Sequence, residues 1–218
     1  MKSKVLSLSV DNESVVKKIR LSRKAWIDYY PHFLDSNYAQ SLMQTLIHEE
    51  AWEQRKIMAL QKEVIQPRLM SWGGDIPYHY SGQTLPVREI HPSIIQLWSY
   101  VEQMTQHTFN HVVINYYRDG KDHMGMHADD EKQLGFNPVI AAISLGINRR
   151  FHVAAKHRKA RKRIYKLMMH HGSLMVMQGD MQHRWRHGVP KMKETQPQGE
   201  RINITFRYLH APPTIKET

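Results

Sequence analysis

The sequence predicts an α+β protein whose helices come first and whose second half forms an antiparallel β-sandwich or barrel. Two segments in the first half repeat apolar residues at the helical spacing of three and four. From about residue 108 onward, short segments rich in β-branched and aromatic residues follow one another, separated by Gly, Pro, Asn or Asp. With 218 residues the chain can bury a sizeable core, and we expect a single domain over residues 1–218.

Each expected element has its own signal. The N-terminal run MKSKVLSLSV is too short in apolar residues for a secretion signal, and we expect an untethered or edge-strand N-terminus. A first helix should begin after Asp35, a suitable N-cap, with Tyr38 and Leu42 on its buried face. A second should begin near Pro92. Residues 66–82 are rich in Pro, Gly and aromatics, which predicts loop and short strands. Further strands are expected at 111–117, 139–145, 151–155, 164–168, 173–177 and 202–207.

Composition limits the possible partners and metals. Lys and Arg number 31 against 20 Asp and Glu, a formal charge of +11 that favours nucleic acid first and an acidic membrane second. The absence of Cys excludes disulfides, Cys-based zinc sites, iron–sulfur clusters and a Cys nucleophile. Any transition metal must therefore be held by Asp, Glu or some of the 15 His. No apolar run approaches the roughly 18 residues of a membrane span, so we expect a cytoplasmic protein, or a nuclear one in a eukaryote.

The triplet His127-Ala128-Asp129 indicates a metal site. In extended backbone, residues two apart point to the same side, so His127 and Asp129 can hold one ion together. His187 is the best third ligand. Two His and one carboxylate form the facial triad of non-haem Fe(II) oxygenases, which leaves positions open for oxygen and a co-substrate. Two alternatives stay open: a solvated acidic turn, and a helical pair of His183 with His187, which nearby Gly188 and Pro190 disfavour.

The last predicted strand alternates strictly. Ile202, Ile204 and Phe206 share one face, and the other face carries Arg201, Asn203, Thr205 and Arg207. An ordinary amphipathic strand with a wet face would give the same alternation. Arginines beside Asn and Thr nevertheless make a row of donors suited to a dicarboxylate, because the Arg fork binds carboxylates bidentately.

Together these motifs resemble the AlkB family of Fe(II)- and 2-oxoglutarate-dependent dioxygenases, the alkylation-repair enzymes. The matching segments run in order from about Gln66 to Tyr208, and they are PRLMSWGG, YHYSG, NYYRDGKDHMGMHADDE, ISLGINRRF, GSLMVMQGDMQHRWRHGVPK and RINITFR. The resemblance implies a double-stranded β-helix (jelly-roll) core over residues 108–208. It also implies that helices from the N-terminal part pack against this core, with residues 1–65 as an N-terminal extension and helix.

The resemblance further implies site residues and co-substrates. Fe(II) falls on His127, Asp129 and His187, and O2 is the oxidant. 2-Oxoglutarate contacts fall on Asn115, Tyr117, Arg201, Asn203, Thr205 and Arg207. A nucleotide-recognition lid falls on the loop from Arg68 to Gly82, within residues 66–90. Substrate contacts fall on Arg68, Trp72, Tyr78, Tyr80, Ser81, Gly82, Asp130 and Glu131. Aromatic faces suit base stacking, although we expect at least one of the three lid aromatics to be structural.

The expected activity is oxidative dealkylation of N-alkylated bases such as 1-methyladenine and 3-methylcytosine in DNA, by a monomer without membrane attachment. A basic run over residues 156–163 favours a phosphate clamp over a merely solvated loop. Three alternatives remain: the same chemistry on RNA, a catalytically silent nucleic-acid-binding module, and a zinc hydrolase with the same ligands. The last ranks lowest because no H-E-x-x-H glutamate is present.

Overall fold

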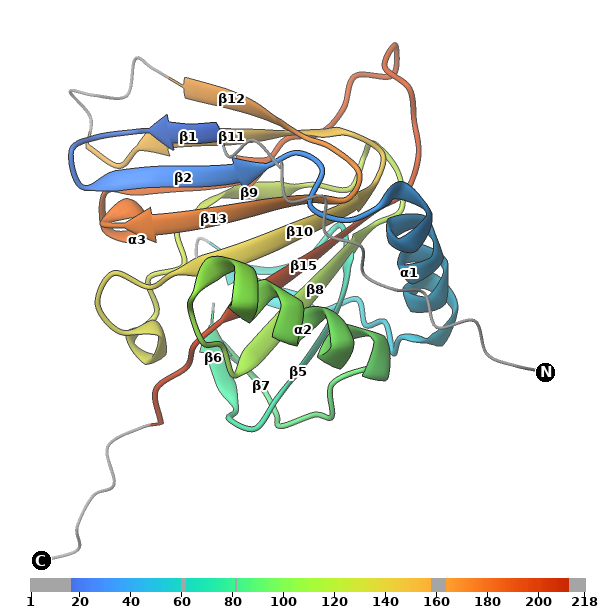
Figure 1. Cartoon of the computed structure of the whole chain (residues 1–218), viewed down its shortest axis with the longest axis horizontal. Coiled ribbons are helices and arrows are strands. Elements are labelled where there is room, and N and C mark those ends of the chain that lie inside the picture. The colour runs from blue at the N-terminus through green and yellow to red at the C-terminus, as the bar shows by residue number, and fades with distance from the viewer. Residues whose placement is uncertain (1–16, 60–61, 81, 158–163, 212–218) are drawn as a thin grey trace, which may run out of the picture.

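Two antiparallel β-sheets packed face to face form the centre of the molecule (Figure 1). The computed structural model describes residues 17–59, 62–80, 82–157 and 164–211. In order across the sheet, the larger one consists of β1 (Lys17–Arg20), β2 (Ala25–Tyr30), β13 (Ser173–Gly179), β10 (Ile140–Gly146), β15 (Arg201–Arg207), β8 (His111–Tyr117) and β5 (Leu69–Gly74). The smaller one consists of β12 (Ile164–Met169), β11 (Arg149–Ala155), β14 (Trp185–Val189) and β9 (Met124–His127).

Two helices cover the outer face of the larger sheet (Figure 1). Helix α1 (Ser36–Glu49) begins where predicted, because the Asp35 carboxylate accepts the backbone N–H groups of Asn37 and Tyr38. Helix α2 (Pro92–Thr105) starts with proline at its first position, where no N–H is needed. The predicted jelly-roll core with N-terminal helices packed against it is therefore confirmed. None of the helices in the described part of the chain is long and apolar enough to cross a bilayer.

The larger sheet separates two hydrophobic cores, and its strand alternation decides which side chain enters which. Ile202, Ile204 and Phe206 of β15 face the helices. Their neighbours face the other sheet, where Arg201 and Arg207 are buried and not wet. The wet-face alternative for this strand is thus wrong, and β15 brings a polar row into the interior of the sandwich.

Residues 66–82 hold more regular structure than the expected loop and short strands. Leu69–Gly74 is a six-residue edge strand that pairs with β8 over its whole length. Gly73 is required there, because a Cβ would lie 2.7 Å from the Ile90 side chain and 3.1 Å from the Glu89 carbonyl oxygen. Gly73 and Gly74 both lie in this paired, buried strand.

Two small hairpins lie outside the main sheets. One pairs β3 (Lys56–Ala59) with β4 (Lys62–Ile65), and the other pairs β6 (Tyr78–Tyr80) with β7 (Gln83–Leu85). Strands β9 and β14 were not predicted, although they carry two of the predicted metal ligands. The expected N-terminal edge segment within residues 1–16 lies outside the described residues, among which β1 forms one edge of the larger sheet.

Candidate active site

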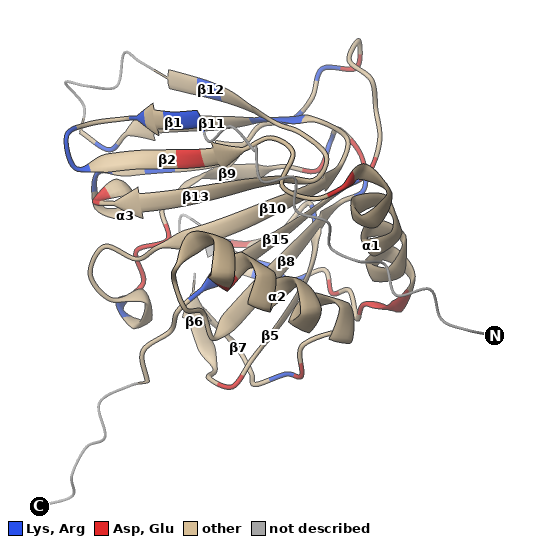
Figure 2. Cartoon of the chain, in the orientation of Figure 1, with Lys and Arg blue, Asp and Glu red and all other residues tan. Residues whose placement is uncertain are grey.

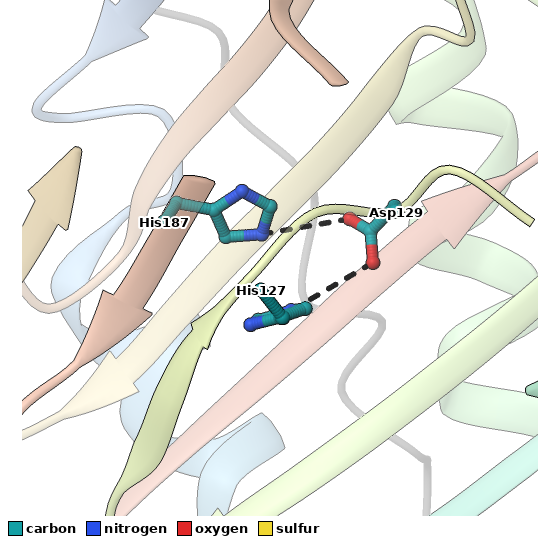
Figure 3. A group of neighbouring side chains, drawn as sticks. All are labelled: His127, Asp129 and His187. Carbon is teal, nitrogen blue, oxygen red and sulfur yellow. Dashed lines mark ion pairs between the residues drawn. The ribbon is translucent and has the colours of Figure 1, made fainter. Parts of the chain in front are cut away.

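Three predicted metal ligands meet inside the sandwich (Figure 3). His127 is the last residue of β9 and pairs directly with His187 of β14, and Asp129 follows two residues after His127. One ligand atom from each of the three lies within 4.8 Å of the others. Asp129 Oδ1 is 3.8 Å from His127 Nε2, and Asp129 Oδ2 is 3.6 Å from His187 Nε2. Antiparallel pairing thus places two imidazoles side by side, facing one carboxylate.

Burial and nearby charges give His187 and Asp129 the protonation states that a metal needs. Burial and the neighbouring His127 lower the pKa of His187 to about 3, which leaves its imidazole neutral at pH 7. Burial raises the pKa of Asp129, but Arg207 and the two imidazoles outweigh it and lower the pKa overall. The Asp129 N–H donates to Gln182 Oε1 at 3.0 Å, which fixes the loop. Two imidazoles, of which the buried one is neutral, and an ionised carboxylate are a donor set that fits Fe(II).

The alternative helical pair of His183 and His187 is wrong. The short helix α3 (Met181–Arg184) ends before His187, which lies in the extended strand β14. His183 instead accepts the backbone N–H of Asn137 at its Nε2, 3.2 Å away. Among the described residues, the group that could hold a metal is the one formed by His127, Asp129 and His187.

Asn203, Thr205 and Arg207 of β15 line a small inner pocket next to the metal ligands, together with Asn115 and Tyr117 of β8. Arg201 begins the same row and lies beside this pocket, 5.2 Å from the centroid of the Tyr117 ring. It is 1% exposed and donates from Nη2 to Ser144 Oγ at 2.8 Å. Its Nε and Nη1 have no hydrogen-bond partner within the described part of the chain. A buried guanidinium with open donors fits the far carboxylate of a dicarboxylic acid. Burial lowers the pKa of Arg201 to about 10, so it still carries its charge at pH 7.

Sequence reasoning missed a second buried arginine beside Tyr117. Arg149 is 1% exposed and lies 5.4 Å from the centroid of the Tyr117 ring, while Arg201 lies 5.2 Å from the same ring. Its guanidinium donates to the backbone carbonyls of Asp119, Asp122 and Pro190. The available signal was its alternation with the buried residues Phe151 and Val153 of β11, which places it on the inward face.

An outer cavity of about 360 Å³ opens on the other side of the metal ligands. Tyr78 and Tyr80 line it with rings stacked 5.5 Å apart at 12°. Arg68 lines it too and donates from Nε to Asn115 Oδ1 at 2.6 Å. Arg207 joins both spaces, since its Nη1 donates to the Tyr78 hydroxyl at 2.9 Å and its Nη2 lies 3.7 Å from Asp129 Oδ1. The cavity is therefore aromatic on one wall and next to the metal ligands on another.

The remaining predicted substrate contacts are not all brought to this cavity. Glu131 lines it, and burial and the nearby Asp129 carboxylate raise its pKa. Asp130 is exposed and pairs with Lys156 at 2.6 Å. Trp72 is 2% exposed and packs under Arg88, 3.7 Å from its ring centroid, away from the cavity. Gly82 lines a separate groove, and Ser81 lies outside the described residues. Trp72 is thus the structural member among the three lid aromatics.

The predicted basic loop is described only at its start. Lys156 donates to Asp130 and to the backbone carbonyl of Gln182, both at 2.6 Å. Residues 158–163 lie outside the described residues, and the phosphate clamp stays a prediction.

Comparison with known proteins gives consistent matches. Residues 27–207 match the family model of the 2OG-Fe(II) oxygenase superfamily. The chain is 38% identical over 193 residues to alpha-ketoglutarate-dependent dioxygenase alkB homolog 3 of Mus musculus, covering 84% of this chain and 66% of that protein. It is 36% identical over 159 residues to DNA oxidative demethylase ALKBH2 of Bos taurus, covering 70% of this chain and 56% of that protein. It therefore spans less than two thirds of the length of these relatives.

A solved structure shares the fold. The structure of OsALKBH1 superposes with a TM-score of 0.60 and 13% sequence identity, covering 88% of this chain and 100% of that chain. At that identity the likeness concerns the arrangement of the strands and helices alone.

Proposed function

This chain belongs to the 2OG-Fe(II) oxygenase superfamily and is AlkB-like, and from that premise we propose that it oxidatively dealkylates N-alkylated bases in nucleic acid. 1-Methyladenine and 3-methylcytosine in DNA are the first candidate substrates. The observation that carries the proposal is the position of His127, Asp129 and His187, between a cationic inner pocket and an aromatic outer cavity. An oxidising centre there reaches a co-substrate on one side and a base on the other.

In this proposal the inner pocket holds 2-oxoglutarate. His127, Asp129 and His187 bind Fe(II), and the open donors of Arg201 bind the far carboxylate. The iron, O2 and 2-oxoglutarate would supply the oxidation, which couples release of succinate and CO2 to hydroxylation of the alkyl carbon and loss of an aldehyde. Arg207 keeps Asp129 ionised and also holds the hydroxyl of Tyr78, so one side chain aligns the metal site with the cavity wall.

The outer cavity holds the flipped base. Tyr78 and Tyr80 offer a pair of parallel rings against which a base can stack. Glu131 has a buried Oε2 without a hydrogen-bond partner among the described residues, and it is available to the polar edge of that base. A base inside a duplex cannot reach this depth without leaving the stack, and damaged or unpaired bases leave it most easily. The net charge of +11 favours the polyanionic substrate.

The test uses purified protein with Fe(II), 2-oxoglutarate and an oligonucleotide that carries one 1-methyladenine. Mass spectrometry should detect loss of the methyl group only with both additions, and His187→Ala should abolish it. His48→Ala, at an exposed position on α1, is the matched control. Turnover of 2-oxoglutarate with the oligonucleotide still methylated would contradict the substrate. No turnover by folded, iron-loaded protein would favour the catalytically silent binding module.

DNA and RNA are separated by the same assay with matched oligonucleotides. We also propose that the protein acts as a monomer. A nucleic-acid substrate supports action in the cytoplasm or, in a eukaryote, the nucleus. Sedimentation and cell fractionation test these two points.

A further inference from the structure

An exposed aromatic side chain lies outside the cavity, on the loop that follows Glu131. Phe136 is 85% exposed, and its ring stacks on the His183 ring at 5.0 Å and 30°. The residues on either side of it, Gly135 and Asn137, both have positive φ, at 71° and 52°. The Asn137 N–H donates to His183 Nε2 at 3.2 Å, which holds the turn against α3. The loop thus keeps a phenyl ring pointing into solvent, where no packing requires it.

A second aromatic pair adjoins this one. Tyr208 is 43% exposed, and its ring lies 5.1 Å from that of His210 in an edge-to-face arrangement. His210 packs on Gly135, where an added Cβ would lie 2.7 Å from the His210 Nε2. We refer to Phe136, His183, Tyr208 and His210 together as the aromatic rim. The rim therefore spans the loop after Glu131, helix α3 and the segment after β15.

Hydrogen bonds connect the rim to the walls of the cavity. Gln133 lies in the same loop, accepts the N–H of His79 at 2.8 Å and donates to the carbonyl of Pro77 at 2.9 Å. These two residues flank Tyr78, whose ring lines the cavity. On the other side, Gln182 precedes His183 and accepts the N–H of Asp129. The rim therefore lies next to the cavity wall that carries Tyr78 and to the loop that carries Asp129.

Exposed basic side chains lie near the aromatic rim. The backbone carbonyl of Lys24, in the turn between β1 and β2, accepts the N–H of Asp180 at 2.8 Å, directly before α3. Arg23, Lys24 and Lys132 are exposed and form no ion pair with any described residue. Figure 2 shows basic residues along β1 and its turn to β2. Unpaired cations beside exposed rings fit a nucleic-acid strand, which presents phosphates and bases together.

We infer that the aromatic rim stacks the unpaired bases next to the one held in the cavity, while the neighbouring cations bind the phosphates of the same strand. This inference rests on the proposed function and deepens it by assigning residues outside the cavity to the nucleotides next to the damaged base. Stacking on a ring does not depend on base identity, so the rim adds affinity without sequence preference.

The decisive variant is Phe136→Ala, compared with Phe136→Tyr and with Ile95→Ala. Ile95 is 54% exposed on α2 and serves as the matched apolar control. The probe is a single-stranded oligonucleotide with one 1-methyladenine and 2-aminopurine beside it. Phe136→Ala should weaken binding roughly fivefold or more and reduce quenching of 2-aminopurine, because a stacking partner is lost. Phe136→Tyr and Ile95→Ala should match the wild type in both measurements.

The rim and the proposed reaction fail in different ways. Unchanged affinity and quenching for Phe136→Ala would overturn the rim, whether or not the wild type restores the base. If Phe136→Ala weakens binding while the wild type restores no base, the rim stays in place and the proposed reaction is wrong. The methylated nucleoside, which has no flanks, should be turned over equally by Phe136→Ala and wild type. A loss of its turnover as large as that for the oligonucleotide would assign Phe136 to the cavity and overturn the inference.

Discussion

Replacing Arg201 with lysine tests the co-substrate pocket most directly. The buried guanidinium donates a hydrogen bond to Ser144, and two of its nitrogens have no hydrogen-bond partner among the described residues. Lysine keeps the positive charge but cannot form the bidentate contact. The loss of one charge-assisted hydrogen bond, about 1.5–3 kcal/mol, should raise the Kd for 2-oxoglutarate roughly 10- to 150-fold. Metal binding should be unaffected, since none of the three ligand residues changes.

Thermal unfolding with and without co-substrate gives the magnitude without an activity assay. A ligand at 100 times its Kd stabilises the folded protein by about 2.7 kcal/mol, and at a Kd raised 100-fold the same concentration gives only about 0.4 kcal/mol. For a chain of this length the difference corresponds to roughly 5–9 °C in the Tm shift caused by 2-oxoglutarate. Arg150→Lys, at an exposed position on β11, is the matched control. A wild-type Tm shift and Kd for Arg201→Lys would refute the assignment of Arg201 to the far carboxylate.

Three further predictions concern stability and the lid. Burial lowers the pKa of His111 to about 3, and neither of its ring nitrogens has a hydrogen-bond partner among the described residues. His111 therefore stays neutral in the folded protein, whereas in the unfolded chain it takes up a proton below pH ~6.5. His111→Phe should therefore remove about 2 kcal/mol of the stability lost between pH 8 and pH 5, and equal pH profiles in urea titrations would contradict this. Gln133→Ala removes the hydrogen bonds to Pro77 and His79. We expect it to raise the KM for the alkylated oligonucleotide roughly 5- to 100-fold and to leave the Kd for 2-oxoglutarate unchanged. A change in that Kd alone would argue against a role of Gln133 in the lid. Gly179→Ala places a Cβ against a backbone carbonyl at a φ of 68° and should lower the free energy of unfolding by about 1–3 kcal/mol, so a variant as stable as the wild type would refute the steric argument.

The strands with a clear alternation could be predicted from the sequence, and so could the residues they carry. Alternation in β15 separates Ile204 from Thr205, and the structure places them in different cores. The helix starts were predictable because Asp35 and Pro92 act locally, through the first turn of each helix. Strand β9 was missed because its four residues show no alternation of buried apolar and exposed polar side chains. It is extended because it pairs with β14, a contact that no local pattern records.

The predicted metal ligands were brought together, but the residues that support them were not predictable. Arg149 and Gln133 bind backbone groups of segments distant along the chain, and such partners leave no pattern in the sequence. Gln182, which fixes the loop of Asp129, acts through a backbone N–H in the same way. The burial of Trp72 was also not determined by its type, since an aromatic residue in a strand next to a cavity can face either side.

The two small hairpins are positioned so that they can diverge between proteins of this architecture without changing the main sheets. They form separate sheets from the strands that hold the metal ligands and the inner pocket. Insertions or exchanges in β3–β4 or β6–β7 leave the register of β8 and β15 unchanged. If the outer cavity holds the flipped base as proposed, grafting these hairpins between relatives should transfer base preference with them. The contact of Arg207 with Tyr78 is the connection that such a graft must preserve, because it joins the inherited chemistry to the exchangeable part.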